Sequence, residues 1–188
     1  KANLQQKGLG PQMVKHGLRL VRQMLNHAVD WGHLRTNPAL KVRYPSIPKT
    51  DIDPLTQEEI HSFFEELAKE YSDQPTALAR WRALHMVAIT SALRIGEILA
   101  MRWGNLDQVS GQYYVKETWH RPKKHRPAYF DEPKTQSSIA PVDLGPTCLD
   151  ALESHRLYQK REILKAGEKY KDQGLIFATA KGGPLHDV

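Results

Sequence analysis

Hydrophobic side chains recur at helical spacing near the start of the chain. The repeat has intervals of four and three residues and is formed by Val14, Leu18, Val21 and Leu25. This spacing predicts a helix over residues 11–31. Further apolar residues widen the stripe, so we expect most of this helix to face other protein.

Prolines interrupt the pattern after this helix. Asn37-Pro38 and the two prolines within residues 44–50 favour an extended connector, because the residue before a proline avoids the helical conformation. We therefore predict a domain boundary in this connector, which separates residues 1–47 from residues 48–188.

Helical patterns resume beyond the connector. Thr56 and Glu59 have the spacing of a capping box and predict the start of one helix. A second helix is expected from Pro75, and it becomes apolar on nearly all sides over residues 83–89, where His85 is expected to be a core histidine with a satisfied hydrogen bond. Small residues at Ser91-Ala92 then predict a break.

Shorter apolar runs follow the break. A short helix with Ile95, Ile98 and Leu99 facing inward comes first, and residues 112–118 and 139–144 are then typical of strands. A long helix is expected between Pro146 and Gly167, and residues 175–177 are expected to form a last short strand. These elements predict an α+β fold that is mainly helical and has a small antiparallel sheet.

Positive charge is concentrated at the start of the chain. The 188 residues carry a net charge of +6, but residues 1–50 hold nine basic side chains and one acidic one. Lys15, Arg19 and Arg22 share the strip of the first helix that is not apolar, and such a strip can follow a phosphate backbone. The alternative is a solvated basic face. A second basic cluster, in residues 119–126, is either a phosphate contact or a solvated loop.

Composition excludes several other classes of protein. No run approaches the roughly 20 apolar residues that a membrane span needs, so we expect no membrane association. Cys148 is the single cysteine, which excludes an intrachain disulfide framework and suits a reducing cytoplasm. The histidines lack the spacing of metal ligands, and we find no nucleotide-binding or hydrolase signature. We therefore expect no metal and no small-molecule cofactor.

The most informative segment is SALRIGEILAMRW at residues 91–103. It places Arg94 in the first turn of the expected short helix, an end where free backbone N–H groups also favour an anion. The simplest explanation for this arginine is an ion pair with Glu97, three residues later, which contributes only about 0.2–0.5 kcal/mol. The alternative is that Arg94 binds phosphate.

This segment resembles the first arginine motif of the tyrosine recombinases, the phage integrase family, written T-G-L-R-x-x-E-L-x-x-L-x-W. Residues 132–138, followed by Pro141-Val142, resemble the family's hairpin lysine segment, P-K-T-x-S-S-x-R-x-V-P-L. Residues 175–185 resemble the strand and turn that precede its second half-site, and residues 29–39 resemble the end of its helical core-binding domain. The resemblance covers nearly the whole chain.

The resemblance implies a function and roles for particular residues. A family member cleaves and rejoins DNA at specific sites through a phosphotyrosine intermediate, as in the integration of a mobile element or prophage. Arg94 would stabilise the phosphate oxygens, Lys134 would act as general acid, with Lys116 as the fallback, and Glu97 would orient Arg94. The implied partners are double-stranded DNA and other recombinase protomers, in the cytoplasm of a prokaryote at the nucleoid.

The resemblance also has departures. Ala92 stands where the family has glycine, which is tolerable if the turn does not need a positive φ, and residues 139 and 140 lack a common arginine. The family's His-x-x-Arg motif and nucleophilic tyrosine have no counterpart, and the chain begins with Lys1 rather than Met. We therefore expect a fragment, from the end of a core-binding domain (1–47) into a catalytic domain (48–188), that binds DNA but does not cleave it.

A rival hypothesis comes from another functional class. A non-enzymatic DNA-binding regulator would use the same basic helix, and it predicts that Lys15, Arg19 and Arg22 matter while Arg94 and Lys134 can be replaced freely. Binding that is insensitive to salt would instead indicate an interaction domain with incidental basicity, since phosphate contacts weaken as salt rises. The base sequence of a DNA target does not follow from these patterns.

Overall fold

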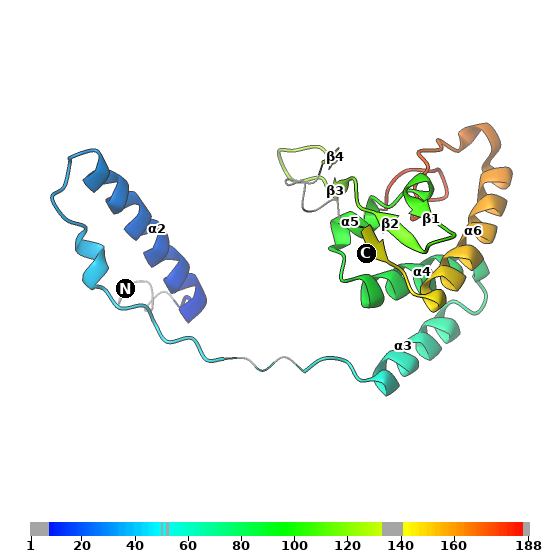
Figure 1. The fold of residues 1–188 in the computed structure, drawn as a ribbon, viewed down its shortest axis with the longest axis horizontal. Helices are drawn as coiled ribbons and strands as arrows, with labels where there is room; N and C mark the ends of the chain where they lie inside the picture. Colours follow the sequence, from blue (N-terminus) through cyan, green and yellow to red (C-terminus); the bar gives the residue numbers. More distant parts are fainter. Residues whose placement is uncertain (1–7, 50, 52, 133–140, 186–188) are drawn as a thin grey trace. The chain divides into compact units, whose positions relative to one another are not determined.

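The chain forms two compact units, Lys1–Pro54 and Leu55–Val188, drawn in Figure 1. The computed structural model describes residues 8–49, 51, 53–132 and 141–185. Residues 43–49, near the end of the first unit, have no regular secondary structure. The boundary expected between residues 47 and 48 stays a prediction.

The first unit is built on helix α2, Pro11–Asp30, close to the range expected from the apolar repeat. A 3₁₀ helix, η1, follows at Pro38–Lys41. Asn37 joins the two, because its side-chain oxygen accepts from the backbone N–H of Ala39 at 2.9 Å and its Nδ2 donates to the carbonyl of Arg22 at 2.9 Å. The Asn37-Pro38 pair thus starts η1 and attaches it to α2.

Only one side of α2 is covered within the described residues. Val14 and Leu18 are buried, but Leu20, Met24 and Trp31 are 61%, 70% and 72% exposed. The expectation that most of this helix faces other protein is therefore wrong for the described structure. The reason is geometric, since a short 3₁₀ helix can cover only a narrow strip of a 20-residue helix.

Two helices open the second unit as the sequence predicts. Helix α3 spans Gln57–Glu70, and helix α4 spans Pro75–Ser91. The capping box is confirmed, because Thr56 Oγ1 accepts from Glu59 N at 3.2 Å and Glu59 Oε2 accepts from Thr56 N at 2.8 Å. Both helix starts thus follow from local residue chemistry.

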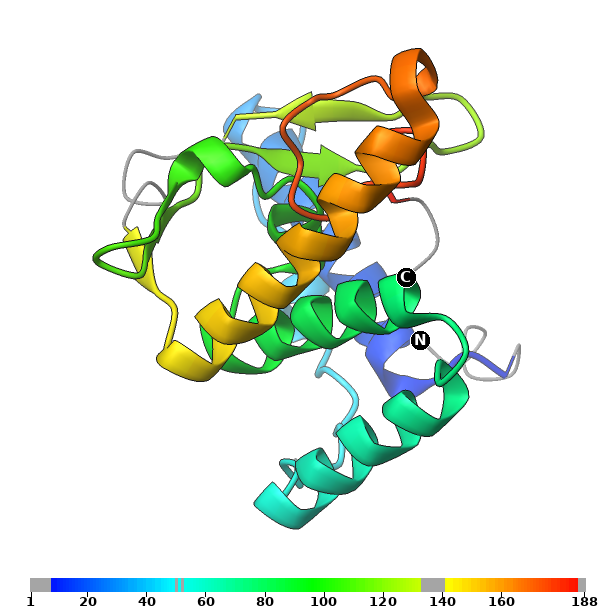
Figure 2. The ribbon, with the colours of Figure 1, turned by 90° about the vertical axis from the view of Figure 1, so that its right-hand side faces the viewer.

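The core of the second unit lies between α4 and the long helix α6, Pro146–Ala166, which lie side by side in Figure 2. The short helix α5, Ile95–Leu99, closes this core. The buried side chains from these three helices include Ala83, Leu84, Val87, Ile98, Leu99, Cys148 and Leu152. The apolar run that the sequence shows in α4 is therefore explained by neighbours on several sides.

Two small antiparallel sheets complete the unit, which confirms the α+β class. One sheet has the order β1-β2-β5, and the other pairs β3 with β4. The strands are β1 Leu106–Asp107, β2 Gln112–Tyr114, β3 Thr118–His120, β4 Tyr129–Asp131 and β5 Pro141–Asp143. The run expected as one strand over residues 112–118 is divided between the two sheets. Two 3₁₀ helices, η2 at Trp103–Asn105 and η4 at Gly167–Lys169, connect these elements.

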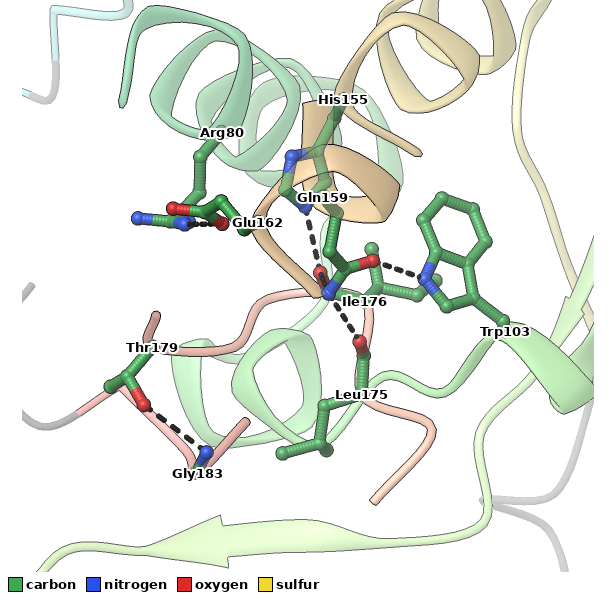
Figure 3. Close-up of polar contacts among 9 residues, drawn as sticks. All are labelled: Arg80, Trp103, His155, Gln159, Glu162, Leu175, Ile176, Thr179 and Gly183. Carbon is green, nitrogen blue, oxygen red and sulfur yellow. Dashed lines mark hydrogen bonds and ion pairs between the residues drawn. The ribbon is translucent and has the colours of Figure 1, made fainter. Parts of the chain in front are cut away.

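The segment Leu175–Ala178 is fully buried but is not the strand that the sequence predicts. It makes isolated backbone bridges, such as Leu175 with Arg102. Side chains of α6 supply other partners: Gln159 Nε2 donates to the Leu175 and Ile176 carbonyls at 2.9 and 3.1 Å, and His155 Nε2 lies 2.7 Å from the Ile176 carbonyl (Figure 3). An apolar run therefore marked burial here rather than sheet pairing.

Candidate active site

A left-handed residue sets up the candidate site. Ala92 has φ 53° and ψ 17°, and it ends α4. Alanine was expected to replace the family's glycine easily if this turn did not need a positive φ. The turn does have a positive φ, so Ala92 is not an easy replacement. A side chain with a Cβ is strained in this conformation by about 1–2 kcal/mol.

Arg94 stands at the N-terminal boundary of α5, directly after this turn. Its side chain is 83% exposed, whereas that of Glu97 is 14% exposed. Glu97 Oε1 lies 3.0 Å from Arg94 Nη1, and Glu97 Oε2 accepts from the Arg94 backbone N–H at 2.9 Å. The carboxylate thus holds both the start of the helix and the guanidinium, and the guanidinium keeps most of its surface open to an anion.

The buried face of α5 is narrower than the sequence predicts. Ile98 and Leu99 are buried, but Ile95 is 45% exposed, so the expectation that all three face inward is wrong for Ile95. Because α5 has five residues, little more than one turn, only one side of it can meet the core.

Gly96 lets α5 approach strand β3 closely. A Cβ at this position would lie 2.8 Å from the Trp119 carbonyl oxygen and 2.9 Å from Thr118 Cγ2. Because the Trp119 oxygen belongs to the backbone, a Cβ at residue 96 would push α5 and β3 apart. The glycine therefore fixes the position of α5, and of Arg94 at its start, against the β3–β4 pair.

Arg102 connects this region to other elements, and the sequence interpretation missed it. Its Nε lies 2.7 Å from Glu117 Oε2, and its guanidinium carbon is 4.9 Å from the centre of the Phe130 ring. Nη1 of Arg102 also contacts the carbonyl of Gln173. The signal in the sequence was an arginine between apolar residues, the same signal that singled out Arg94, but Arg102 turns to protein and Arg94 to solvent.

The loop between β3 and β4 carries the second basic cluster. Its tip is closed by a backbone pair in which Lys123 N donates to the Arg126 carbonyl at 2.8 Å and the reverse bond is 3.0 Å. Arg126 lies 4.1 Å from the centre of the Tyr129 ring, and His120 stacks on that ring at 4.7 Å. The basic loop is therefore a structured hairpin, and it extends from the strand that α5 contacts.

The remaining predicted catalytic residue cannot be placed beside Arg94. Lys134 lies outside the described residues, so its role stays a prediction. Lys116, the fallback for Lys134, is exposed in the segment that joins β2 to β3.

The three predicted DNA-binding cations of α2 have different surroundings. Arg22 points to protein: its Nε donates to the Ala39 carbonyl at 3.0 Å, its Nη2 contacts the carbonyls of Leu40 and Val42, and it lies 4.2 Å from the centre of the Tyr44 ring. Arg19 is exposed, and Lys15 is half-buried. The structure therefore gives Arg22 a role in holding η1 on α2, while Arg19 keeps the surface that a phosphate contact needs.

Two histidines of the second unit have structural surroundings. His85 Nδ1 lies 2.7 Å from the Trp81 carbonyl, which supplies the hydrogen bond expected of a core histidine, although His85 is only half-buried. His155 is fully buried, and burial lowers its pKa to about 4. His155 is therefore neutral near pH 7 and offers no positive charge to an anion.

Neither a metal-ligand cluster nor a membrane-spanning helix occurs in the part of the chain that the structure describes. Among residues 8–49, 51, 53–132 and 141–185, no group of three or more His, Cys, Asp or Glu side chains could hold a metal ion. None of the described helices is both long and apolar enough to cross a membrane.

Comparison with known sequences identifies relatives along nearly the whole chain. No family model matches it. A tyrosine recombinase XerC-like protein of Caldanaerobacter subterraneus is 29% identical over 198 residues, which include 97% of this chain and 48% of the relative. The ICEBs1 integrase of Bacillus subtilis is 24% identical over 180 residues, or 94% of this chain and 46% of the relative. The chain therefore spans about half the length of these relatives.

Comparison with solved structures shows that the fold of this chain is similar to that of integrases. The Tn1549 transposon integrase, solved in complex with a circular intermediate DNA, matches 98% of this chain and 56% of its own with a TM-score of 0.72 and 19% identity. A lambda integrase dimer bound to a core site matches 98% of this chain with a TM-score of 0.53 and 15% identity. At these identities the likeness establishes the arrangement of the elements.

Proposed function

We propose that this chain, which is similar in sequence and fold to tyrosine recombinases, is part of a protein that cleaves and rejoins DNA at specific sites through a phosphotyrosine intermediate. The observation that carries the proposal is Arg94, an exposed guanidinium held by Glu97 at the start of α5. The names of the relatives are those of recombinases and integrases, and no observation favours the non-enzymatic regulator.

The proposed reaction needs fixed positive charge. When a tyrosine attacks the scissile phosphodiester, negative charge grows on the non-bridging oxygens, and a planar donor with two N–H groups can meet it. Arg94 presents such a donor to solvent, and Glu97 holds its direction. The phosphotyrosyl link conserves the energy of the broken bond, so the step requires no nucleotide cofactor.

Lys134 completes the part of the machinery that we assign to this chain. The 5′-oxygen that leaves the phosphorus needs a proton, and a lysine can deliver it as a general acid. The assignment rests on the resemblance of residues 132–138 to the family's lysine segment. The second arginine, the later histidine and the nucleophilic tyrosine have no counterpart in these 188 residues, and we propose that the chain by itself binds DNA without cleaving it.

We assign DNA backbone contacts to both units. In the first unit Lys15 and Arg19 lie along α2, within a region of net charge +8. In the second unit the structured tip of the β3–β4 hairpin carries Lys123 and Arg126. We place this reaction in the cytoplasm, on DNA, with other copies of the recombinase as partners, by analogy with the lambda integrase dimer bound to its core site.

Substitution of Arg94 by lysine in the full-length protein tests the proposal. Lysine keeps the charge but not the planar pair of donors, so we expect Arg94→Lys to leave DNA affinity within about twofold and to lower strand cleavage by at least about 100-fold. Cleavage is measured on a radiolabelled duplex with the recombination site. A cleavage rate near wild type would contradict the assignment of Arg94.

The 188-residue chain is tested separately. With a nicked duplex that traps the covalent intermediate, we expect a salt-dependent noncovalent complex and no covalent adduct on a denaturing gel. A covalent adduct would contradict the proposal that this chain lacks the nucleophile.

A further inference from the structure

A second basic site lies at the opposite end of α4 from Arg94. A cleft of about 580 Å³ is formed where the last turn of α6, η4 and the turn at residues 179–183 meet the start of α4. Four of its lining residues carry a positive charge, and two others are polar or acidic: Arg161, Lys165, Lys169 and Lys181, with Thr76 and Glu162. This concentration of cations is unexpected in a unit that carries 18 Lys and Arg against 18 Asp and Glu, a net charge of zero.

The carboxylate in the cleft is already neutralised by another residue. Glu162 forms an ion pair with Arg80, and the two side chains are only 19% and 12% exposed (Figure 3). Arg80 is not among the lining residues. The four lining cations are therefore not compensated by Glu162, and they favour a ligand with several negative charges.

The turn that carries Lys181 is held by hydrogen bonds. In the turn that carries Lys181, Thr179 N donates to the Gly183 carbonyl at 2.7 Å and Gly183 N donates to Thr179 Oγ1 at 3.1 Å (Figure 3). The Lys181 carbonyl accepts from Lys171 N at 2.9 Å. Gly182 has φ +85°, and a Cβ there would lie 2.3 Å from the Lys171 carbonyl oxygen, so glycine lets the turn pack directly against the backbone of Lys171.

The ends of two antiparallel helices meet at this cleft. The C-terminal end of α6 brings a partial negative charge, and the N-terminal end of α4, represented by Thr76, brings a partial positive one. These partial charges offset each other, so the charged side chains determine the sign of the electrostatic potential in the cleft. Thr76 and Ser91 are separated along α4 by about 22 Å, at about 1.5 Å per residue, so this cleft is distinct from the site of Arg94.

We propose that this cleft binds a run of two or three adjacent phosphate groups. Its volume falls in the range of about 300–1,000 Å³ that is typical of ligand sites. Its four lining cations favour a ligand that carries several negative charges. Adjacent phosphates are carried by free polyphosphates, including nucleoside polyphosphates, and by a nucleic-acid backbone. The proposal is independent of the role of Arg94.

Titration calorimetry with inorganic tripolyphosphate at low salt tests the proposal on the 188-residue chain. We expect one site per chain, and we expect Lys165→Gln with Lys181→Gln to weaken binding at least tenfold. The control is Lys160→Gln with Lys171→Gln, which removes two exposed charges from the same region but outside the cleft lining, and it should change affinity less than twofold. Thermal unfolding verifies that both variants fold.

Two results would overturn the proposal: absence of measurable binding, or an equal loss of affinity in both double variants, which would indicate diffuse attraction. A competition experiment then identifies the source of the phosphates. If a 20-base-pair duplex displaces tripolyphosphate from the wild-type chain, the cleft holds a nucleic-acid backbone. If tripolyphosphate stays bound at saturating duplex, the cleft holds a free polyphosphate.

Discussion

Glu97 contacts Arg94 at two points, the guanidinium and the backbone amide. One carboxylate oxygen lies 3.0 Å from Nη1, and the other accepts from the backbone N–H at 2.9 Å. The start of α5 and the direction of the exposed guanidinium are thus fixed by a single side chain. The ion pair that could be dismissed as a weak surface contact is also the support of the candidate catalytic group.

Replacement of Glu97 by glutamine separates these two contacts. Glutamine can still accept from the backbone N–H but cannot pair with the guanidinium as an anion. In the full-length protein we expect Glu97→Gln to lower strand cleavage roughly tenfold through misorientation of Arg94, while DNA affinity stays within about twofold. Glu66→Gln, which breaks a comparable i, i+3 contact with Lys69 on exposed α3, is the matched control and should leave cleavage unchanged.

Ala92→Gly should stabilise the chain. Ala92 is strained at φ 53°, and glycine adopts this conformation without a Cβ penalty. We expect a gain of about 1 kcal/mol in the free energy of unfolding, measured by urea denaturation. The same substitution at Ala88, inside α4, should destabilise by about 1 kcal/mol or more. Equal effects at both positions would contradict a left-handed Ala92.

Gly96→Ala should have the opposite effect. The added Cβ would lie 2.8 Å from the Trp119 carbonyl oxygen, so α5 must move away from β3. We expect a loss of about 1–3 kcal/mol in the free energy of unfolding. Gly104→Ala is the control, because a Cβ there meets no atom within 4 Å. If the two variants were equally stable, the close approach of α5 and β3 would be disproved.

His155 should make stability depend on pH. Burial lowers its pKa from 6.5 to about 4, so the unfolded chain binds the proton more readily than the folded one. Stability should therefore fall as the pH drops from about 6.5 to about 4, by up to about 3 kcal/mol, with no contribution from this group above that window. The difference between wild type and His155→Gln in urea midpoints isolates the effect, and the variant should have the flatter profile.

Arg19 and Arg22 should differ although both lie on α2. Arg19→Gln removes an exposed charge, so it should reduce the salt dependence of DNA binding, by about 0.9 in the slope of log K against log salt for one phosphate contact. Arg22→Gln removes contacts to the carbonyls of Ala39 and Leu40, so its first effect should be destabilisation of the unit Lys1–Pro54. Fluorescence anisotropy and thermal unfolding measure the two effects. An unchanged salt slope for Arg19→Gln would contradict its role as a phosphate contact.

The helices could be predicted because their determinants are local. The capping box at Thr56 and Glu59, and the stretch from Pro146 to Gly167, place helix ends through residues that act on their own neighbours. Arg94 could be singled out for the same reason, since its motif and its partner Glu97 lie within four residues of each other.

Other features depend on contacts that sequence spacing does not contain. Arg22 lies on the basic strip of α2, but its targets are carbonyls 17 to 20 residues later, so the strip alone could not separate it from Arg19. The left-handed conformation of Ala92 was hidden because alanine usually avoids it. The cleft at Lys165 and Lys181 brings together cations from segments that are separated along the chain. The net charge of a long range of residues therefore does not reveal it.

The attachment of Leu175–Ala178 has a consequence for which substitutions this fold can accept. In a sheet, a strand is held by backbone groups that every residue except proline provides, so its neighbours can change freely. Here the carbonyls of Leu175 and Ile176 are recognised by the side chains of Gln159 and His155. The position of the segment thus depends on two side chains of α6 as well as on its backbone bridges, so substitutions of Gln159 and His155 should be constrained.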